Sequence, residues 1–185
     1  SPARPRAAVV VTGSELLTGA ISDKNGPWVA EHLGALGFEV SHVLVVGDRP
    51  ADLADALEFV RGAALVVTSG GLGPTADDLT AEEANRKQAM VPRGAVALPP
   101  VGTAPGLVVT VPDGPVVIVL PGPPRELQGM WQAALASDPV AALLAGVPPA
   151  RSRSLRFFGL PESEIAATLR TLDVGDVEVT TCLRR

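Results

Sequence analysis

A glycine-rich segment at residues 69–74, with the sequence Ser-Gly-Gly-Leu-Gly-Pro, has the composition of a phosphate-binding loop. Glycine lets the backbone come close to a ligand and adopt positive φ, so that successive N–H groups can converge on an anion. The segment is neither a Walker loop, because no lysine follows, nor a Rossmann loop, because the glycine spacing differs. Taken alone it is as compatible with a tight turn between a strand and a helix as with phosphate binding, and both interpretations stay open.

Two adjacent carboxylates, Asp77 and Asp78, follow the glycine-rich segment. Beside an anion-binding loop they would repel a phosphate unless a divalent cation lay between them. One of them could instead cap the helix that is predicted to follow, as aspartate commonly does at this position. We therefore expect one structural and one functional aspartate.

Two further loops bring polar residues to the ends of predicted strands. Thr12-Gly13-Ser14-Glu15 follows the first strand, and Gly47-Asp48 follows the second. Taken singly, Glu15 could be an ordinary first-turn acid facing a helix dipole, and Asp48 could be a helix N-cap. Open parallel sheets bind ligands outside the carboxyl ends of their strands. Because three loops converge there, a ligand site is favoured over three separate structural roles.

Two loops of small residues lie later in the chain, at residues 102–106 and 121–124. The second lies between a strand and a helix, so it could direct helix amides at another phosphate or at a ring edge. A rigid proline turn is the alternative, and the residues alone favour it. His32 and His42 have no metal-ligand partner at suitable spacing, and Trp28 and Trp131 are expected in the core.

The elements that position these loops alternate between strand and helix. Apolar β-branched runs predict buried strands, and apolar residues at helical spacing predict amphipathic helices. The predicted strands are residues 7–11, 39–46, 65–68, 107–111 and 116–120; the predicted helices are 28–36, 50–61, 123–136 and 139–145, and 79–90 is compatible with another. Asp113-Gly114 predicts a hairpin turn between the last two strands. This order predicts an α/β fold with a mostly parallel sheet and helices on both faces.

A boundary between two parts of the chain is predicted at Pro148-Pro149. Residues 1–149 then form the main domain. Residues 150–185 contain a predicted strand at 154–158, a helix at 162–172 and a strand at 177–181. Because this is too little to bury a core of its own, the segment is expected to dock on the first domain or to be an incomplete unit.

The composition excludes several classes of protein. With 46% hydrophobic and 19% charged residues, the chain is not an intrinsically disordered polymer. Its net charge of -5 argues against a nucleic-acid partner, and a single cysteine, Cys182, excludes an internal disulfide framework or a multi-cysteine zinc site. No apolar run reaches transmembrane length, and residues 1–6 lack the apolar stretch of a signal peptide. We expect a soluble cytoplasmic protein with no membrane partner.

Taken together, the motifs resemble the MoaB/Mog-type molybdopterin-binding family, and specifically its CinA-like branch. Residues 12–17, with Gly19, Ile21 and Asn25, match the opening signature of that branch. The further matching blocks, in consistent order over nearly the whole chain, are residues 46–48, 69–80, 85–89, 101–106, 120–126 and 158–164. The resemblance implies a three-layer MoaB/Mog-like α/β fold, followed by the start of a small α+β segment.

The chain departs from this family pattern at two places. CinA-like proteins usually carry a few dozen residues between the blocks that end at Thr80 and begin at Asn85, whereas only four residues separate them here. Full-length members can also have a carboxyl-terminal amidohydrolase domain for nicotinamide mononucleotide. This sequence contains none of that domain, so that activity is not assigned to it.

The resemblance implies hydrolysis of the pyrophosphate of ADP-ribose or a related nucleotide, with a divalent metal. Asp78 aligns with an aspartate that is linked to adenylyl transfer in molybdopterin-handling relatives, so we assign the catalytic role to Asp78 with Asp48. These two and Glu15 are the candidate metal ligands, whereas the amides of Gly70, Gly71 and Gly73 would hold a phosphate. The candidate substrate-binding residues are Thr12, Gly13, Ser14, Glu15, Asn25, Ser69, Gly70, Gly71, Gly73, Pro74, Thr80, Gly102, Thr103, Gly122 and Pro123.

Two other functions stay open beside the hydrolase. One is molybdopterin binding or adenylylation in molybdenum cofactor assembly, with a pterin in place of the nucleotide. The other is a non-catalytic nucleotide-binding domain that keeps the fold, since a fold does not determine a function. The resemblance also implies a homodimer or another homo-oligomer.

Overall fold

The computed structural model describes residues 3–70, 92–102, 104–148, 153, 155–175, 177 and 179–181. The chain divides into two compact units, Arg4–Ala150 and a smaller one made of Ser1–Ala3 and Arg151–Arg185. Residues 149–152 lie outside the described part, so the boundary at residue 149 stays a prediction.

A six-stranded sheet with the strand order β2-β1-β3-β6-β5-β4 forms the centre of the larger unit. The strands are β1 (Arg6–Thr12), β2 (Glu39–Val46), β3 (Leu65–Ser69), β4 (Val96–Leu98), β5 (Gly106–Thr110) and β6 (Val116–Leu120). The first four in spatial order pair in parallel, and β5 and β4 add an antiparallel edge. The carboxyl ends of four neighbouring strands therefore meet at one edge, as the sequence predicts.

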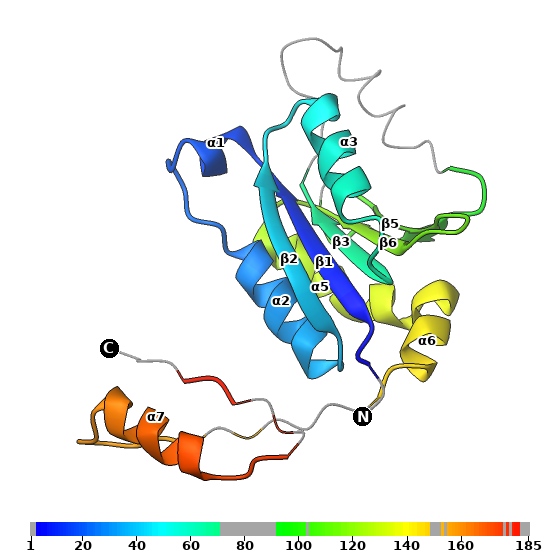
Figure 1. Cartoon of the computed structure of the whole chain (residues 1–185). Helices are drawn as coiled ribbons and strands as arrows, with labels where there is room; N and C mark the ends of the chain where they lie inside the picture. The colour runs from blue at the N-terminus through cyan, green and yellow to red at the C-terminus, as the bar shows by residue number, and fades with distance from the viewer. Residues whose placement is uncertain are drawn as a thin grey trace. The chain divides into compact units, whose positions relative to one another are not determined.

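Helices cover both faces of this sheet (Figure 1). They are α1 (Ser14–Leu17), α2 (Asn25–Ala35), α3 (Pro50–Phe59), α5 (Pro124–Ala136) and α6 (Asp138–Ala145). The alternating side chains of β1 show the layering: Val9 and Val11 join one core with α2 and α5, whereas Val10 joins a second core with Ala56 of α3. Both cores are fully buried at these valines. The predicted three-layer α/β fold is confirmed.

Three details of the larger unit differ from the expected elements or refine them. Strand β4 was not predicted, because its three residues lie in a stretch rich in proline and glycine, and the pairing of Val96 with Val108 of β5 is a long-range contact. The four-residue helix α1 is too short for a periodic signal. The predicted hairpin turn is confirmed, with Asp113 at φ 53°. The helix considered at 79–90 lies outside the described residues.

The predicted packing of the aromatic residues is confirmed. Trp131 is buried in the core, and Trp28 packs against it edge-on with ring centroids 5.5 Å apart. The ring of His32 stacks on Trp28 at 3.7 Å, and its Nδ1 lies 2.8 Å from the Trp28 carbonyl. The ring of His42 contacts Phe59 at 5.0 Å. Both histidines therefore pack against aromatic rings.

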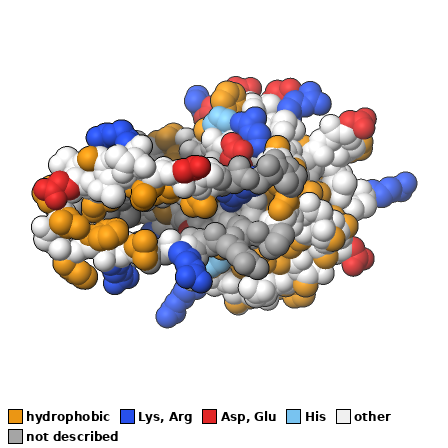
Figure 2. Space-filling model, turned by 60° about the horizontal axis from the view of Figure 1, so that its bottom comes forward, with side chains coloured by type: hydrophobic (Ala, Val, Ile, Leu, Met, Phe, Trp, Pro, Cys, Tyr) orange, Lys and Arg blue, Asp and Glu red, His pale blue; other side chains and the backbone are white. Residues whose placement is uncertain are grey.

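The smaller unit contains one helix, α7 (Glu162–Thr171), where the sequence predicts one. The strands predicted at 154–158 and 177–181 are wrong, since none of their described residues forms a strand. Hydrophobic side chains reach the surface at many places on the face shown in Figure 2, and in this unit Leu155 and Phe158 are 80% and 89% exposed. Apolar alternation does not make a strand without a partner strand to complete its hydrogen bonds.

No helix in the described part of the chain is long and apolar enough to cross a membrane.

Candidate functional site

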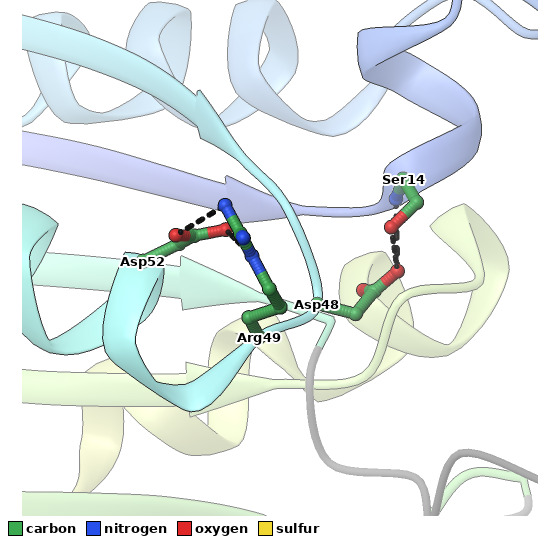
Figure 3. A network of polar contacts seen from close by, with 4 residues as sticks. All are labelled: Ser14, Asp48, Arg49 and Asp52. Atoms are coloured by element: carbon green, nitrogen blue, oxygen red, sulfur yellow. Dashed lines mark hydrogen bonds and ion pairs between the residues drawn. The ribbon is translucent and has the colours of Figure 1, made fainter.

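The loops after β1 and β2 are joined by hydrogen bonds at the carboxyl edge of the sheet (Figure 3). The backbone N–H and the hydroxyl of Ser14 both donate to Oδ2 of Asp48, at 2.9 and 2.7 Å. Beside them, the N–H of Gly13 donates to the carbonyl of Val46 at 3.0 Å. The predicted convergence of these two loops is therefore seen directly, and Ser14 fixes the position of the Asp48 carboxylate.

The neighbouring cation, Arg49, does not balance the charge of Asp48. Its guanidinium donates to Asp52 at 3.0 and 3.1 Å, and Figure 3 shows the side chain directed at that residue. The hydrogen bond to Asp52, and then the charge of Asp52, raise the pKa of Arg49. The residue before α3 is Arg49, not Asp48, so Asp48 is not the helix N-cap that was considered. Among the described residues, only the hydroxyl and the backbone N–H of Ser14 donate to its carboxylate.

The end of β3 passes so close to β1 that only glycine fits at position 70. Gly70 has φ +88°, and its N–H donates to the carbonyl of Leu120 at 3.1 Å. A Cβ at this position would lie 2.6 Å from Oγ1 and 2.7 Å from the carbonyl oxygen of Thr12. A Cβ on Gly122 would lie 3.6 Å from Cα of Gly70. Three of the predicted site residues, Thr12, Gly70 and Gly122, are thus brought together.

Asn25, the first residue of α2, connects the helix to two strand ends. Its Nδ2 donates to Oγ of Ser69 at 2.8 Å and to the carbonyl of Gly122 at 2.7 Å. The hydroxyl of Ser69 in turn lies 3.4 Å from the carbonyl of Pro121. These contacts cross from β3 to the loop between β6 and α5, so Asn25 holds the two ends in one arrangement.

Asp23 is a structural residue of the site that the sequence interpretation missed. Its Oδ1 accepts hydrogen bonds from the N–H groups of Asn25 and Gly26, both at 2.9 Å. These are unpaired donors of the first turn of α2, so Asp23 positions Asn25. The available signal was an aspartate two residues before a helix start, the pattern of an Asx turn.

Two buried oxygens at this edge have no hydrogen-bond partner among the described residues: Oγ1 of Thr12 and Oδ1 of Asn25. The two residues are only 8% and 6% exposed. An unsatisfied buried polar group costs about 1–3 kcal/mol. Thr12 ends β1, and Asn25 contacts the last residue of β3, so both atoms lie near the edge where the sequence predicts a ligand, and a ligand could satisfy them.

Replacing Thr12 by valine tests whether its hydroxyl is unpartnered in the folded protein. We expect Thr12→Val to raise the free energy of unfolding by about 1 kcal/mol, because valine has the same shape and removes a buried hydroxyl that has no partner. Urea denaturation measures the change. Thr110→Val, at an exposed position of β5, controls for the strand preference of valine. A loss of stability at Thr12 would contradict the expectation.

The other described candidates are less directly part of this arrangement. Glu15 is exposed in the first turn of α1, with Oε1 turned toward Gly13. Gly102 lies against the side chain of Glu126 in α5, which fills the space that a Cβ would need. Pro123 has the extended conformation of a residue preceding a helix, and its carbonyl accepts bonds from the first turn of α5. Gly102 therefore has the geometry of a packing residue, and Pro123 has that of a turn residue.

Several candidates lie outside the described residues: Gly71, Gly73, Pro74, Asp78, Thr80 and Thr103. Within the described part, no three His, Cys, Asp or Glu side chains come together in a way that could hold a metal. Asp48 and Glu15 therefore do not make a complete metal site by themselves. The carboxylate of Asp48 is nevertheless a suitable donor for a hard divalent cation.

Comparison with known proteins identifies the type of domain. A family model described as "Probable molybdopterin binding domain" matches residues 8–142. The CinA-like protein of Mycolicibacterium vanbaalenii is 46% identical over 227 aligned positions, covering 97% of this chain and 53% of that protein. The chain thus spans about half the length of this relative. Because the aligned positions exceed the 185 residues of the chain, the relative carries additional residues within the matched region.

Solved structures show the same fold. The CinA protein of Thermoplasma acidophilum, a protein of unknown function, has a TM-score of 0.62 and 29% identity, covering 70% of this chain and 95% of that chain. The molybdopterin biosynthesis Mog protein of Mycobacterium ulcerans has a TM-score of 0.53 and 24% identity, covering 79% of this chain and 100% of that chain. The second similarity concerns the fold alone.

Proposed function

The chain belongs to the family of probable molybdopterin binding domains, as a CinA-like member, and from this premise we propose that it hydrolyses the pyrophosphate of ADP-ribose or a related nucleotide with a divalent metal. The observation that carries the proposal is the carboxylate of Asp48. Ser14 holds it at the carboxyl edge of the sheet, and no cationic side chain balances it among the described residues. A phosphate at this edge requires such a charge to be neutralised by a cation.

The residues divide into two roles under this proposal. Asp78, with Asp48 or Glu15, would hold the metal, and the backbone amides at Gly70, Gly71 and Gly73 would hold a phosphate. A bound divalent cation supplies charge neutralisation and an activated water. Water adds to one phosphorus, the bond from that phosphorus to the bridging oxygen breaks, and the products are AMP and ribose phosphate.

The direct test is incubation of the chain with ADP-ribose and Mg²⁺ or Mn²⁺, followed by detection of AMP. We expect AMP to appear with metal and to be absent when EDTA removes the metal. Metal-independent release, or no release with any divalent metal, would contradict the proposal. Since the chain spans about half of its relatives' length, the same assay on a full-length relative is the control for a missing partner domain.

A second candidate is molybdopterin binding or adenylylation. The family match over residues 8–142 favours it, because that family is described by molybdopterin binding. Tight binding of molybdopterin together with no turnover of ADP-ribose would support it. Tight binding of ADP-ribose without turnover under any metal would instead support a non-catalytic nucleotide-binding domain. We also propose a homodimer or another homo-oligomer, which light scattering would count.

A further inference from the structure

The orientation of the Asn25 side chain is fixed by chemistry. The atom that lies 2.7 Å from the carbonyl oxygen of Gly122 must be the amide nitrogen, because a carbonyl only accepts hydrogen bonds. The same nitrogen lies 2.8 Å from Oγ of Ser69. Its two hydrogens are therefore both used by the protein, and Oδ1 points elsewhere as a pure acceptor.

Nothing in this small network can donate to that oxygen. The hydroxyl of Ser69 receives the bond from Asn25 and is directed at the carbonyl of Pro121, which accepts only. The other unpartnered oxygen, on Thr12, lies against Gly70 and is not a member of the network. Oδ1 of Asn25 is thus a buried acceptor without a donor. The residue is only 6% exposed.

We propose that Oδ1 of Asn25 accepts a hydrogen bond from an uncharged N–H or O–H group of the bound ligand, such as a sugar hydroxyl or a ring N–H, and does not contact phosphate. A phosphate oxygen carries lone pairs and negative charge, so it would repel a second acceptor in a buried position. The inference rests on the proposed function only in that a nucleotide or pterin reaches this edge. It separates Asn25 from the phosphate-binding residues and makes it a specificity-determining residue.

The test compares two ligands by calorimetry with Mg²⁺ present: ADP-ribose, which has hydroxyl and N–H donors, and inorganic pyrophosphate, which has the diphosphate alone. We expect Asn25→Ala to weaken ADP-ribose binding about 10-fold more than pyrophosphate binding, the range of a hydrogen bond left unmade in a buried site. Equal weakening of both ligands would overturn the inference. A pterin, tested in the same way, distinguishes a ring N–H from a sugar hydroxyl as the donor.

A second variant separates ligand recognition from loss of structure. Asn25→Asp keeps an acceptor oxygen but loses the contacts to Ser69 and Gly122, so the ratio of the two affinities should stay near that of the parent. A purely structural role would weaken both ligands alike, and would leave this ratio near that of the parent in Asn25→Ala as well. If the variants do not fold, NMR spectra of the parent protein provide the test instead. We expect the side-chain amide signals of Asn25 to shift when ADP-ribose is added and not when pyrophosphate is added. An equal shift with both ligands would overturn the inference.

The outcomes also distinguish this inference from the proposed function. Discrimination between ADP-ribose and pyrophosphate without turnover supports the role of Asn25 and rejects the hydrolase. If the chain hydrolyses ADP-ribose but Asn25→Ala does not change the ratio of the two affinities, the hydrolase is supported and the role of Asn25 is rejected. A parent chain that binds neither ADP-ribose nor the pterin overturns the role of Asn25, whose oxygen is then satisfied by a buried water.

Discussion

Gly70→Ala is expected to lower the free energy of unfolding by about 3 kcal/mol, through backbone strain together with overpacking. At φ +88° a residue with a Cβ is strained whatever the space around it. The added methyl group would also lie 2.6 and 2.7 Å from two oxygens of Thr12, one of which belongs to the backbone of β1. Since the backbone of a central strand cannot easily move aside, the ends of β1 and β3 must separate. Urea denaturation measures the loss.

A matched variant isolates the clash from the strain. Gly94 has nearly the same φ, +86°, and no atom lies within 4 Å of the position of its Cβ. Gly94→Ala should therefore cost only about 1 kcal/mol, the conformational part alone. Equal losses at the two positions would show that the contact with Thr12 relaxes freely, and the argument that β1 and β3 meet tightly at the site would fail.

Most of the larger unit could be predicted because its signals are local. The apolar β-branched residues of β1, β2, β3 and β6 need only their own sequence to be identified as strands. Strand β4 could not be found in this way, since Val96–Leu98 becomes a strand only by pairing with β5. The prediction of a strand at 154–158 failed for a related reason: a local pattern was present, but none of the described residues 155–158 pairs in a strand.

The location of the site could be predicted from the sequence, but the contacts between its residues could not. The meeting of the loops at Ser14, Asp48 and Gly70 follows from parallel strand order, which the alternation of elements implies. The two contacts of Asn25 depend on distances between residues far apart in sequence, whereas Arg49 is diverted from Asp48 by Asp52, only three residues after it. Gly102 was predicted as a substrate-binding residue because it lies in a block that resembles the family. In the structure it packs against the side chain of Glu126.

Asp48→Asn is expected to slow the metal-dependent hydrolysis of ADP-ribose by about 100-fold or more, because loss of a carboxylate near a metal typically costs this much in affinity or activity. Asparagine keeps an oxygen that can accept the two bonds from Ser14, at 2.9 and 2.7 Å in the parent. The loop between β2 and α3 should therefore stay in place, and only the negative charge is removed. Initial rates across a titration of Mg²⁺ measure the effect.

The neighbouring carboxylate provides the control for a general change of charge. Asp52 lies four residues later, is paired with Arg49 at 3.0 Å, and has no proposed role at the metal. Asp52→Asn should leave the rate and its metal dependence close to those of the parent. If Asp48 is a ligand, excess Mg²⁺ should partly restore Asp48→Asn but have no such effect on Asp52→Asn. A parent-like rate in Asp48→Asn at limiting metal would remove Asp48 from the metal site and leave Asp78 and Glu15 as the remaining candidates.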